Sequence, residues 1–409
     1  MSIRLQDYQE VAGPGVIEEL RVLADRVAGR RMQHINSTPV GGGVAEVLTR
    51  LVPLIRELGL EATWDVIKGD QAFFSVTKAF HNALHGKPEE ITEEMFDIFR
   101  ANTEMNLRDI DFTGDVIFVH DPQPAGLVLR KKELGRHWVW RCHIDVSAPQ
   151  PGVWNFLRPY VEQYDAAIFS MPDFAQRLPV LQCRVAPSID PLADKNKPLD
   201  PSYVAGVLEK YKIDPGRPVL TQVSRFDRFK DPLGVIDAYR LVKRRYKCQL
   251  VLAGGGASDD PEGEEVLREV QEKAADDPDI HVLLLPPFSD LEINALVRAS
   301  TVVIQKSVRE GFGLTVSEAL WKKKPVIGGA VGGIKLQVID GVTGFLVHSA
   351  EGAANRIAQL LGDRRLRERL GENGYLHVKQ NFLLTRHVKD YVLTVLALEH
   401  PHESVVHLG

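Results

Sequence analysis

The chain has 409 residues, more than one hydrophobic core usually serves, so we expect two domains. A composition with 44% hydrophobic and 26% charged residues is that of an ordinary globular protein, and a net charge of -5 argues against a nucleic-acid partner, which would need a basic face. Three cysteines without CxxC spacing exclude a disulfide framework, and no apolar run is long enough to span a membrane, so we expect a cytoplasmic protein with reduced thiols and no membrane partner.

The first half begins with an amphipathic helix and a glycine-rich turn. Apolar positions at helical spacing predict the helix over residues 16–28, and Met32 to Asn36 predicts a strand. Glycines 41, 42 and 43 then lead into a helical pattern that begins at Val44. Glycines at such a turn let backbone N–H groups face a ligand, although tight turning alone would also explain them. The G-x-G-x-x-G dinucleotide fingerprint is absent.

Further short apolar runs alternate with helical patterns, which is typical of a doubly wound parallel sheet. The predicted strands are Thr63–Ile67, Asp115–Val119, Trp138–Arg141, Ala166–Phe169 and Arg184–Ala186. Two strand ends carry polar residues: His120-Asp121-Pro122-Gln123 follows one strand, and Cys142-His143-Ile144-Asp145 follows the next. A single histidine is more often structural than catalytic. Two histidine-containing ends at the ligand-binding edge of one sheet favour a polar ligand.

A pair of histidines lies between these segments. His81 and His85 are spaced i, i+4, a spacing that can hold a metal on a helix face. Because no HExxH glutamate and no third ligand accompany them, we interpret Lys78–His85, which includes Asn82, as a polar helix face or loop that lines the ligand crevice.

A proline-rich stretch from residue 187 to 218 predicts a linker with one short helix near Val204–Tyr211. A second series of strands follows: Val219–Val223, Gln249–Ala253, His281–Leu285, Thr301–Ile304, Pro325–Ile327 and Gly344–Val347. The turn after the first of these holds Arg225 and Lys230, the cations that a diphosphate requires, although alone they would be ordinary surface cations. Glycines 254–256 follow the second. The acidic runs 259–265 and 276–279 are interpreted as solvated loops rather than metal sites.

The fourth strand of this half leads into Arg309-Glu310-Gly311-Phe312-Gly313-Leu314 and then a helical pattern. The free N–H groups of a first helical turn carry the positive end of the helix dipole, and glycines allow close approach, so this geometry predicts an anion site. Glu310 and Glu318 flank it. Carboxylates beside a phosphate would serve neutral hydroxyls such as those of sugars. The alternative is that Glu318 complements the helix dipole and Glu310 is solvated.

Taken together, the two α/β halves, Arg225 with Lys230, and the Glu310-to-Glu318 motif resemble the retaining family-4 glycosyltransferases over essentially the whole chain. The resemblance implies the GT-B fold, with two Rossmann-like, doubly wound parallel-sheet domains facing across a cleft. We expect an acceptor domain at 1–200, a nucleotide-sugar donor domain at 201–380, and a C-terminal helix at about 380–409 that packs back on the first domain.

Within that family, the segments 36–45, 120–123, 141–145 and 328–334 resemble the trehalose glycosyltransferring synthases. This implies a reversible enzyme that makes trehalose from a nucleoside-diphosphate glucose (ADP-, UDP- or GDP-glucose) and free glucose. Trehalose phosphorylase shares much of the pattern and remains an alternative, as does a non-catalytic sugar-binding protein of the same fold. One departure is Gly329, where the family pattern has an arginine.

The resemblance also implies roles for single residues. Glu310, Arg225, Lys230 and His143 would carry the chemistry. The donor would be held by Gly42, Gly43, Arg225, Lys230, Gly311, Phe312, Gly313, Leu314 and Glu318. The acceptor sugar would be held by Asp121, Gln123, Gly42, His143 and Asn82. We expect no tightly bound cofactor and no protein-bound metal, with Mg²⁺ acting at most as a counterion of the nucleotide, and a homodimer.

Overall fold

The computed structural model describes residues 4–40, 43–255, 261–401 and 403. The chain forms two compact units: unit 1 comprises Met1–Pro187 and Leu384–Gly409, and unit 2 comprises Ser188–Leu383. The division falls before residue 200 because the segment after Pro187 is hydrogen-bonded to residues in or directly after helices of unit 2. Arg298 and Lys322, for example, donate hydrogen bonds to the backbone and side chain of Asn196.

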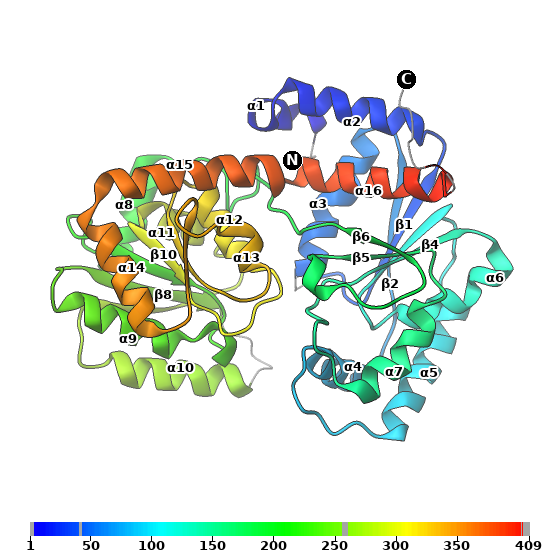
Figure 1. Cartoon of the computed structure of the whole chain (residues 1–409), viewed down its shortest axis with the longest axis horizontal. Coiled ribbons are helices and arrows are strands. Elements are labelled where there is room, and N and C mark those ends of the chain that lie inside the picture. Colours follow the sequence, from blue (N-terminus) through cyan, green and yellow to red (C-terminus); the bar gives the residue numbers. More distant parts are fainter. Residues whose placement is uncertain (1–3, 41–42, 256–260, 402, 404–409) are drawn as a thin grey trace. The chain divides into compact units, whose positions relative to one another are not determined.

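Unit 1 is built on a six-stranded parallel sheet in the order β2-β1-β3-β4-β5-β6 (Figure 1). Its strands are β1 Arg31–Asn36, β2 Glu61–Val66, β3 Val116–His120, β4 His137–Arg141, β5 Ala166–Phe169 and β6 Leu181–Arg184. Its α-helices are α1 Gln9–Ala12, α2 Pro14–Arg26, α3 Gly43–Glu57, α4 Gln71–Leu84, α5 Glu93–Asp109, α6 Lys131–Leu134, α7 Pro151–Val161 and α16 Leu384–Glu399, and its 3-10 helices are η1 Leu5–Tyr8, η2 Ala125–Arg130 and η3 Pro172–Phe174.

The sixth strand was predicted in the wrong place. The sequence pattern indicated residues 184–186, whereas β6 ends at Arg184. The cause is that β6 lies at the sheet edge and is mostly exposed, so it has no apolar run of its own. Val185 and Ala186, which suggested the strand, are buried just beyond it.

The C-terminal helix α16 is part of unit 1, where it packs against α2 and α3. Its apolar residues Val388, Val392 and Val395 are fully buried. The Arg386 side chain fixes the start of the helix, since its Nη2 donates to the carbonyl oxygen of Ala186 at 2.7 Å. Residues at opposite ends of the chain therefore share one core.

Unit 2 contains a second six-stranded parallel sheet, in the order β12-β11-β10-β7-β8-β9. Its strands are β7 Val219–Val223, β8 Gln249–Gly255, β9 Ile280–Leu285, β10 Val302–Gln305, β11 Val326–Gly329 and β12 Gly344–Val347. Its helices are α8 Pro201–Lys210, η4 Arg228–Lys230, α9 Pro232–Lys243, α10 Pro261–Ala274, α11 Asp290–Ala299, α12 Leu314–Trp321, α13 Ile334–Gln337, α14 Ala350–Gly362 and α15 Arg364–Asn381. All six strands overlap the runs identified from the sequence.

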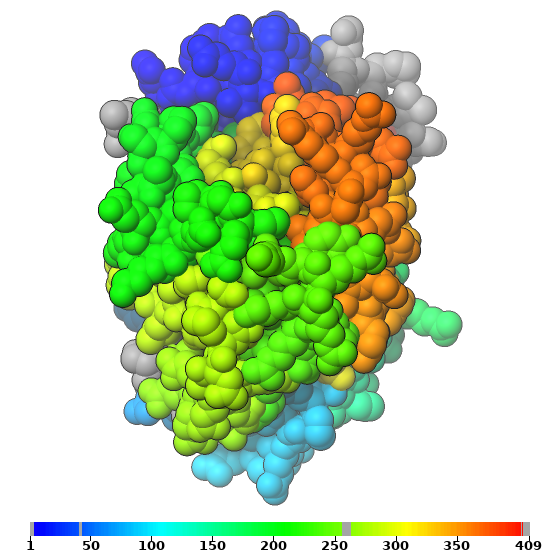
Figure 2. Space-filling model, turned by 90° about the vertical axis from the view of Figure 1, so that its left-hand side faces the viewer, coloured from blue at the N-terminus to red at the C-terminus, as the bar shows by residue number. Residues whose placement is uncertain are grey.

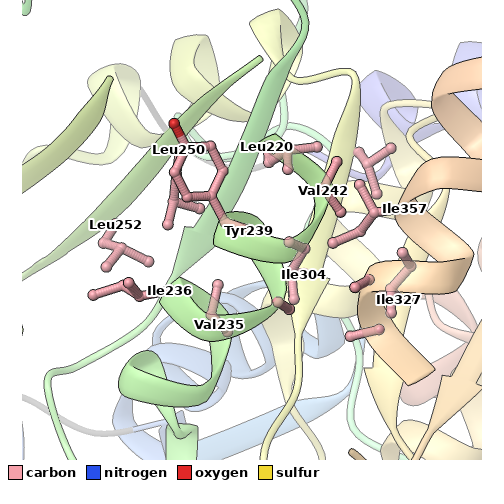
Figure 3. Close-up of a cluster of buried hydrophobic side chains, with 14 of the residues drawn as sticks. Leu220, Val235, Ile236, Tyr239, Val242, Leu250, Leu252, Ile304, Ile327 and Ile357 are labelled. Atoms are coloured by element: carbon pink, nitrogen blue, oxygen red, sulfur yellow. The ribbon is translucent and has the colours of Figure 1, made fainter. Parts of the chain in front are cut away.

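Helices cover both faces of the second sheet, because alternate residues of each strand point to opposite faces. Leu220, Leu250 and Leu252 meet residues of α9 and α14 in one core, part of which Figure 3 shows. Their neighbours Val219 and Val251 meet α8 and α11 in the other. Figure 2 shows one face of unit 2, with α8 in green, α10 in yellow-green and α14 in orange.

Among the helices that the structure describes, none is both long enough and apolar enough to cross a lipid bilayer.

Candidate functional site

Except for Gly42 and Gly43, the residues expected to hold the donor lie in unit 2, near the carboxyl ends of β7 and β10. The turn after β7 is held by short contacts. Asp227 caps η4 by accepting from the backbone N–H of Lys230 at 3.1 Å, and the Gln222 amide donates to the Lys230 carbonyl at 2.7 Å. Arg225 is different, because its side chain is 69% exposed and its contact to the Asp227 carboxylate is 3.4 Å. The turn therefore fixes Lys230 and leaves the Arg225 guanidinium extended towards solvent.

The Lys230 ammonium and the Glu310 carboxylate form an ion pair with an N–O distance of 2.5 Å. Their side chains are only 17% and 9% exposed. The Ser307 hydroxyl lies 3.2 Å from the same Glu310 oxygen. Folding thus joins the two predicted donor-side residues, which are 80 positions apart in the sequence. An ammonium has three N–H donors, so Lys230 can bind a phosphate oxygen while it keeps Glu310.

Gly311, Phe312, Gly313 and Leu314 form the turn into α12. Gly313 adopts a left-handed backbone with φ of 81° and directly precedes the helix. In this first turn, the N–H of Val316 donates to the Gly313 carbonyl at 2.9 Å, whereas the N–H groups of the residues before it have no acceptor within the helix and can face an anion. The side-chain amide of Gln337 donates to the Phe312 carbonyl at 2.5 Å and braces the turn from behind.

A glycine loop after β11 packs directly against this turn. A Cβ atom on Gly332 would lie 1.6 Å from the carbonyl oxygen of Glu310, and the Gly332 φ of 45° is also unfavourable for other residues. At Gly329, where the family pattern has an arginine, a Cβ would lie 2.1 Å from the Ser307 carbonyl oxygen. Glycine at 329 therefore permits an approach between these backbones that an arginine would prevent in this arrangement.

Glu318 lies in the second turn of α12 and is only 5% exposed. One turn later, the ammonium of Lys322 donates to the Glu318 carbonyl at 3.0 Å and to the Asn196 side chain at 3.0 Å. Burial lowers the pKa of Lys322 to about 7, and the Glu318 carboxylate opposes that shift. Glu318 is thus anchored among buried polar groups.

The residues expected to face the acceptor sugar lie in unit 1, after β3 and β4. The Asp121 carboxylate accepts a hydrogen bond from the backbone N–H of His143 at 2.7 Å, which brings these two strand ends together. Asp121 itself has a left-handed backbone with φ of 68°. Its burial raises its pKa to about 6. Gln123 lies two residues after Asp121, and its buried side-chain oxygen has no hydrogen-bond partner in the part of the chain that the structure describes.

The sequence analysis also predicted Gly42 and Asn82 at the acceptor sugar, and Gly43 at the donor. Gly42 lies outside the described residues, as do Gly41 and Gly256, and Gly43 is the first residue of α3. Asn82, on α4, donates to the Glu89 carboxylate at 2.8 Å. His85 caps the C-terminus of α4, and its ring contacts that of His81 at a centroid distance of 4.5 Å. Within the described part of the chain, no group of three histidine, cysteine or acidic residues could hold a metal ion.

The sequence analysis placed His120 at a polar strand end without giving it a role of its own, and it did not single out His34. His120, the last residue of β3, and His34, in the middle of β1, are both buried. The His120 ring lies 2.9 Å from that of His143, and the His34 ring lies 3.1 Å from that of His120. For His34, the sequence offers only a polar residue within a predicted strand. Strand order was needed to show that β1 and β3 are neighbours.

Comparisons with known proteins identify the family of the chain. A family model described as "Trehalose synthase, N-terminal domain" matches residues 34–176, and one described as "Glycosyl transferases group 1" matches residues 207–377. The trehalose synthase of Thermococcus litoralis is 46% identical over 396 residues, covering 95% of this chain and 96% of that protein. The trehalose phosphorylase of Pleurotus pulmonarius is 30% identical over 430 residues, covering 91% of this chain and 58% of that protein.

The fold also has solved counterparts. The sucrose-phosphate synthase of Thermosynechococcus elongatus superimposes with a TM-score of 0.71 at 17% identity, covering 91% of this chain and 100% of that one. At that identity the likeness shows the fold alone, which is GT-B. From the family models and the 46% identity to a full-length relative, it follows that this chain belongs to the trehalose synthase family of glycosyltransferases.

Proposed function

We propose that the protein is a retaining glucosyltransferase that makes trehalose from a nucleoside-diphosphate glucose and free glucose, in a reversible reaction. The observation that carries the proposal is the Lys230–Glu310 pair beside the N-terminus of α12. It combines a fixed cation, backbone N–H groups for an anion, and a carboxylate that can accept from sugar hydroxyls. The family relationship supports the choice of trehalose as the disaccharide.

In the proposed reaction, the bond between the anomeric carbon of the donor glucose and the diphosphate oxygen breaks. Negative charge develops on that oxygen, where Lys230, Arg225 and the N–H groups near Gly313 would stabilise it. A hydroxyl of the acceptor glucose attacks the anomeric carbon from the same face, so the configuration is retained. Its proton passes to the leaving diphosphate. The products are trehalose and a nucleoside diphosphate.

The Lys230–Glu310 contact argues against a double displacement in which Glu310 is the nucleophile. A retaining glycosidase needs two carboxyl groups about 5 Å apart, one of them free to attack carbon. Glu310 is instead paired with an ammonium and hydrogen-bonded by Ser307, which lowers its nucleophilicity. We therefore assign Glu310 to binding a sugar hydroxyl.

The test is to incubate the protein with ADP-, UDP- or GDP-glucose, each with free glucose, and to measure disaccharide and released nucleoside diphosphate. Equimolar formation of trehalose and diphosphate with at least one donor is expected. Lys230→Ala tests whether the reaction depends on this site. Arg228→Ala is the matched control, because Arg228 lies in the same turn but is paired with Glu269 on α10. Absence of disaccharide with every donor would refute the proposal.

Trehalose phosphorolysis is a second candidate, favoured by the 30% identity to a trehalose phosphorylase. Inorganic phosphate would then occupy the site beside Lys230. Incubation with trehalose and phosphate in the absence of nucleotide separates the two functions. Formation of glucose 1-phosphate would establish phosphorolysis, whereas breakdown that requires a nucleoside diphosphate would establish the synthase reaction in reverse.

A further inference from the structure

Three buried imidazoles form a continuous hydrogen-bonded row within unit 1. His34 Nδ1 lies 3.1 Å from His120 Nε2, and His120 Nδ1 lies 2.9 Å from His143 Nε2. The first two side chains are fully buried, and His143 at the end of the row is partly exposed. Both ring nitrogens of His120 are used. The row therefore runs from the sheet interior to the strand end where a sugar is proposed to bind.

Burial favours the neutral form of all three rings. Burial lowers the pKa of His34 to about 3, and burial also lowers the pKa values of His120 and His143 well below their ordinary value. The fully buried guanidinium of Arg141 acts in the same direction on the last two, and so does His387 of α16 on His143. A neutral imidazole carries one N–H and one acceptor nitrogen.

Only two proton arrangements satisfy both contacts. In the first, every Nδ1 carries the proton, so His34 donates to His120 and His120 donates to His143. In the second, every Nε2 carries the proton and both hydrogen bonds run in the opposite direction. Any mixed arrangement places two N–H groups, or two lone pairs, against each other. The row therefore makes the tautomer of His143 depend on that of His34.

The far end of the row decides between the two arrangements. His34 Nε2 is buried and has no hydrogen-bond partner among the described residues. The second arrangement would leave a buried N–H unsatisfied there, and orphaned buried N–H groups are rare because they cost the full desolvation of a donor. The first leaves only a bare lone pair. The first arrangement is therefore favoured.

We propose that His34 and His120 are positioning residues that hold His143 with its proton on Nδ1, so that His143 acts as a fixed hydrogen-bond donor to a sugar oxygen. The contact with sugar rests on the proposed function, whereas the tautomer does not. In this state His143 has no free lone pair, since its Nε2 accepts from His120. It therefore does not serve as a general base.

The tautomer can be read directly in the full-length protein. Two-bond ¹H–¹⁵N correlation spectra of protein labelled with ¹⁵N-histidine distinguish a protonated Nδ1 from a protonated Nε2, and a His143→Gln spectrum assigns the His143 signals. We expect protonated Nδ1 in the wild type, although free imidazole side chains favour Nε2. A His143 ring protonated on Nε2 would overturn the proposal, whether or not the protein transfers glucose.

Two substitutions of His120 separate positioning from mere packing. His120→Asn keeps an N–H donor near the place of Nδ1, whereas His120→Leu removes it. We expect His143 to keep its Nδ1 proton in the first and to lose it in the second. The KM for glucose should rise about 10-fold in His120→Leu, the effect of one hydrogen bond, and by clearly less in His120→Asn.

Equal losses in both variants, with no change of tautomer, would assign His120 a purely structural role. His34→Asn and His34→Leu provide the same contrast from the buried end of the row. If His120→Leu fails to fold, these two variants test whether the row sets the tautomer of His143. If no nucleotide-glucose supports transfer, the proposed function fails while the spectra still test the row.

Discussion

Acidification from pH 7 to pH 5.5 should destabilise unit 1, because its interior holds histidines that stay neutral at pH 5.5 only while the protein is folded. Their pKa values are all lowered by burial: His34, His120, His143 and His387. A group whose pKa is lowered by folding contributes stability above its unfolded pKa, and that stability is lost as the pH falls towards the folded value. For His34 the window runs from 6.5 down to about 3.

The magnitude follows from those two values. Between pH 7 and 5.5, His34 alone should lower the free energy of unfolding by roughly 1 kcal/mol. Asp121 acts oppositely, because burial raises its pKa to about 6 and its protonation in the folded state offsets roughly 1 kcal/mol over the same range. The other three histidines act in the direction of His34. The net loss should therefore exceed about 1 kcal/mol.

Urea denaturation followed by tryptophan fluorescence is a suitable assay, since Trp64, Trp138, Trp140 and Trp154 lie in unit 1 and only Trp321 lies in unit 2. The midpoint should shift to lower urea at pH 5.5. A His34→Asn variant, which removes one titrating group, should show a shallower dependence on pH. Equal or greater stability at pH 5.5 would refute the reasoning, because the histidines would then be protonated within the folded protein.

Three further outcomes are expected. Lys230→Ala or Arg225→Ala should lower the rate of transfer by at least about 10²-fold, the usual scale for removing one charge-stabilising group, and near-normal steady-state rates would exclude these residues from the diphosphate site. Gly332→Ala should abolish transfer and lower the melting temperature, since its Cβ would lie 1.6 Å from the Glu310 carbonyl oxygen. The control Gly341→Ala, at a φ of 73° but in open space, should cost only about 1 kcal/mol of backbone strain. Equal effects of the two substitutions in calorimetry would contradict this. Thorough chelation should leave transfer measurable, because cationic side chains are proposed at the diphosphate, and activity restored only by one divalent ion would show otherwise.

Sequence patterns were sufficient for the architecture. Alternating apolar runs and helical patterns predicted two parallel sheets, and the structure confirms both. Edge strand β6 was the exception, because exposed residues on a sheet edge need not be apolar. Local motifs also identified Arg225, Lys230 and the turn at Gly313, since glycines and cations at strand ends have a direct meaning in this kind of sheet. Their roles remain predictions.

Contacts between distant segments were decided only by the tertiary structure. The sequence places Lys230 and Glu310 in separate motifs, and the adjacency of β7 and β10 is what joins them as an ion pair. In the same way, the neighbouring strands β1, β3 and β4 align His34, His120 and His143 in one row. Hydrophobic periodicity predicts which residues are buried, because it shows which face of each helix or strand is apolar. Strand order determines which buried polar groups meet, and the periodicity of a single strand carries no information about its neighbours.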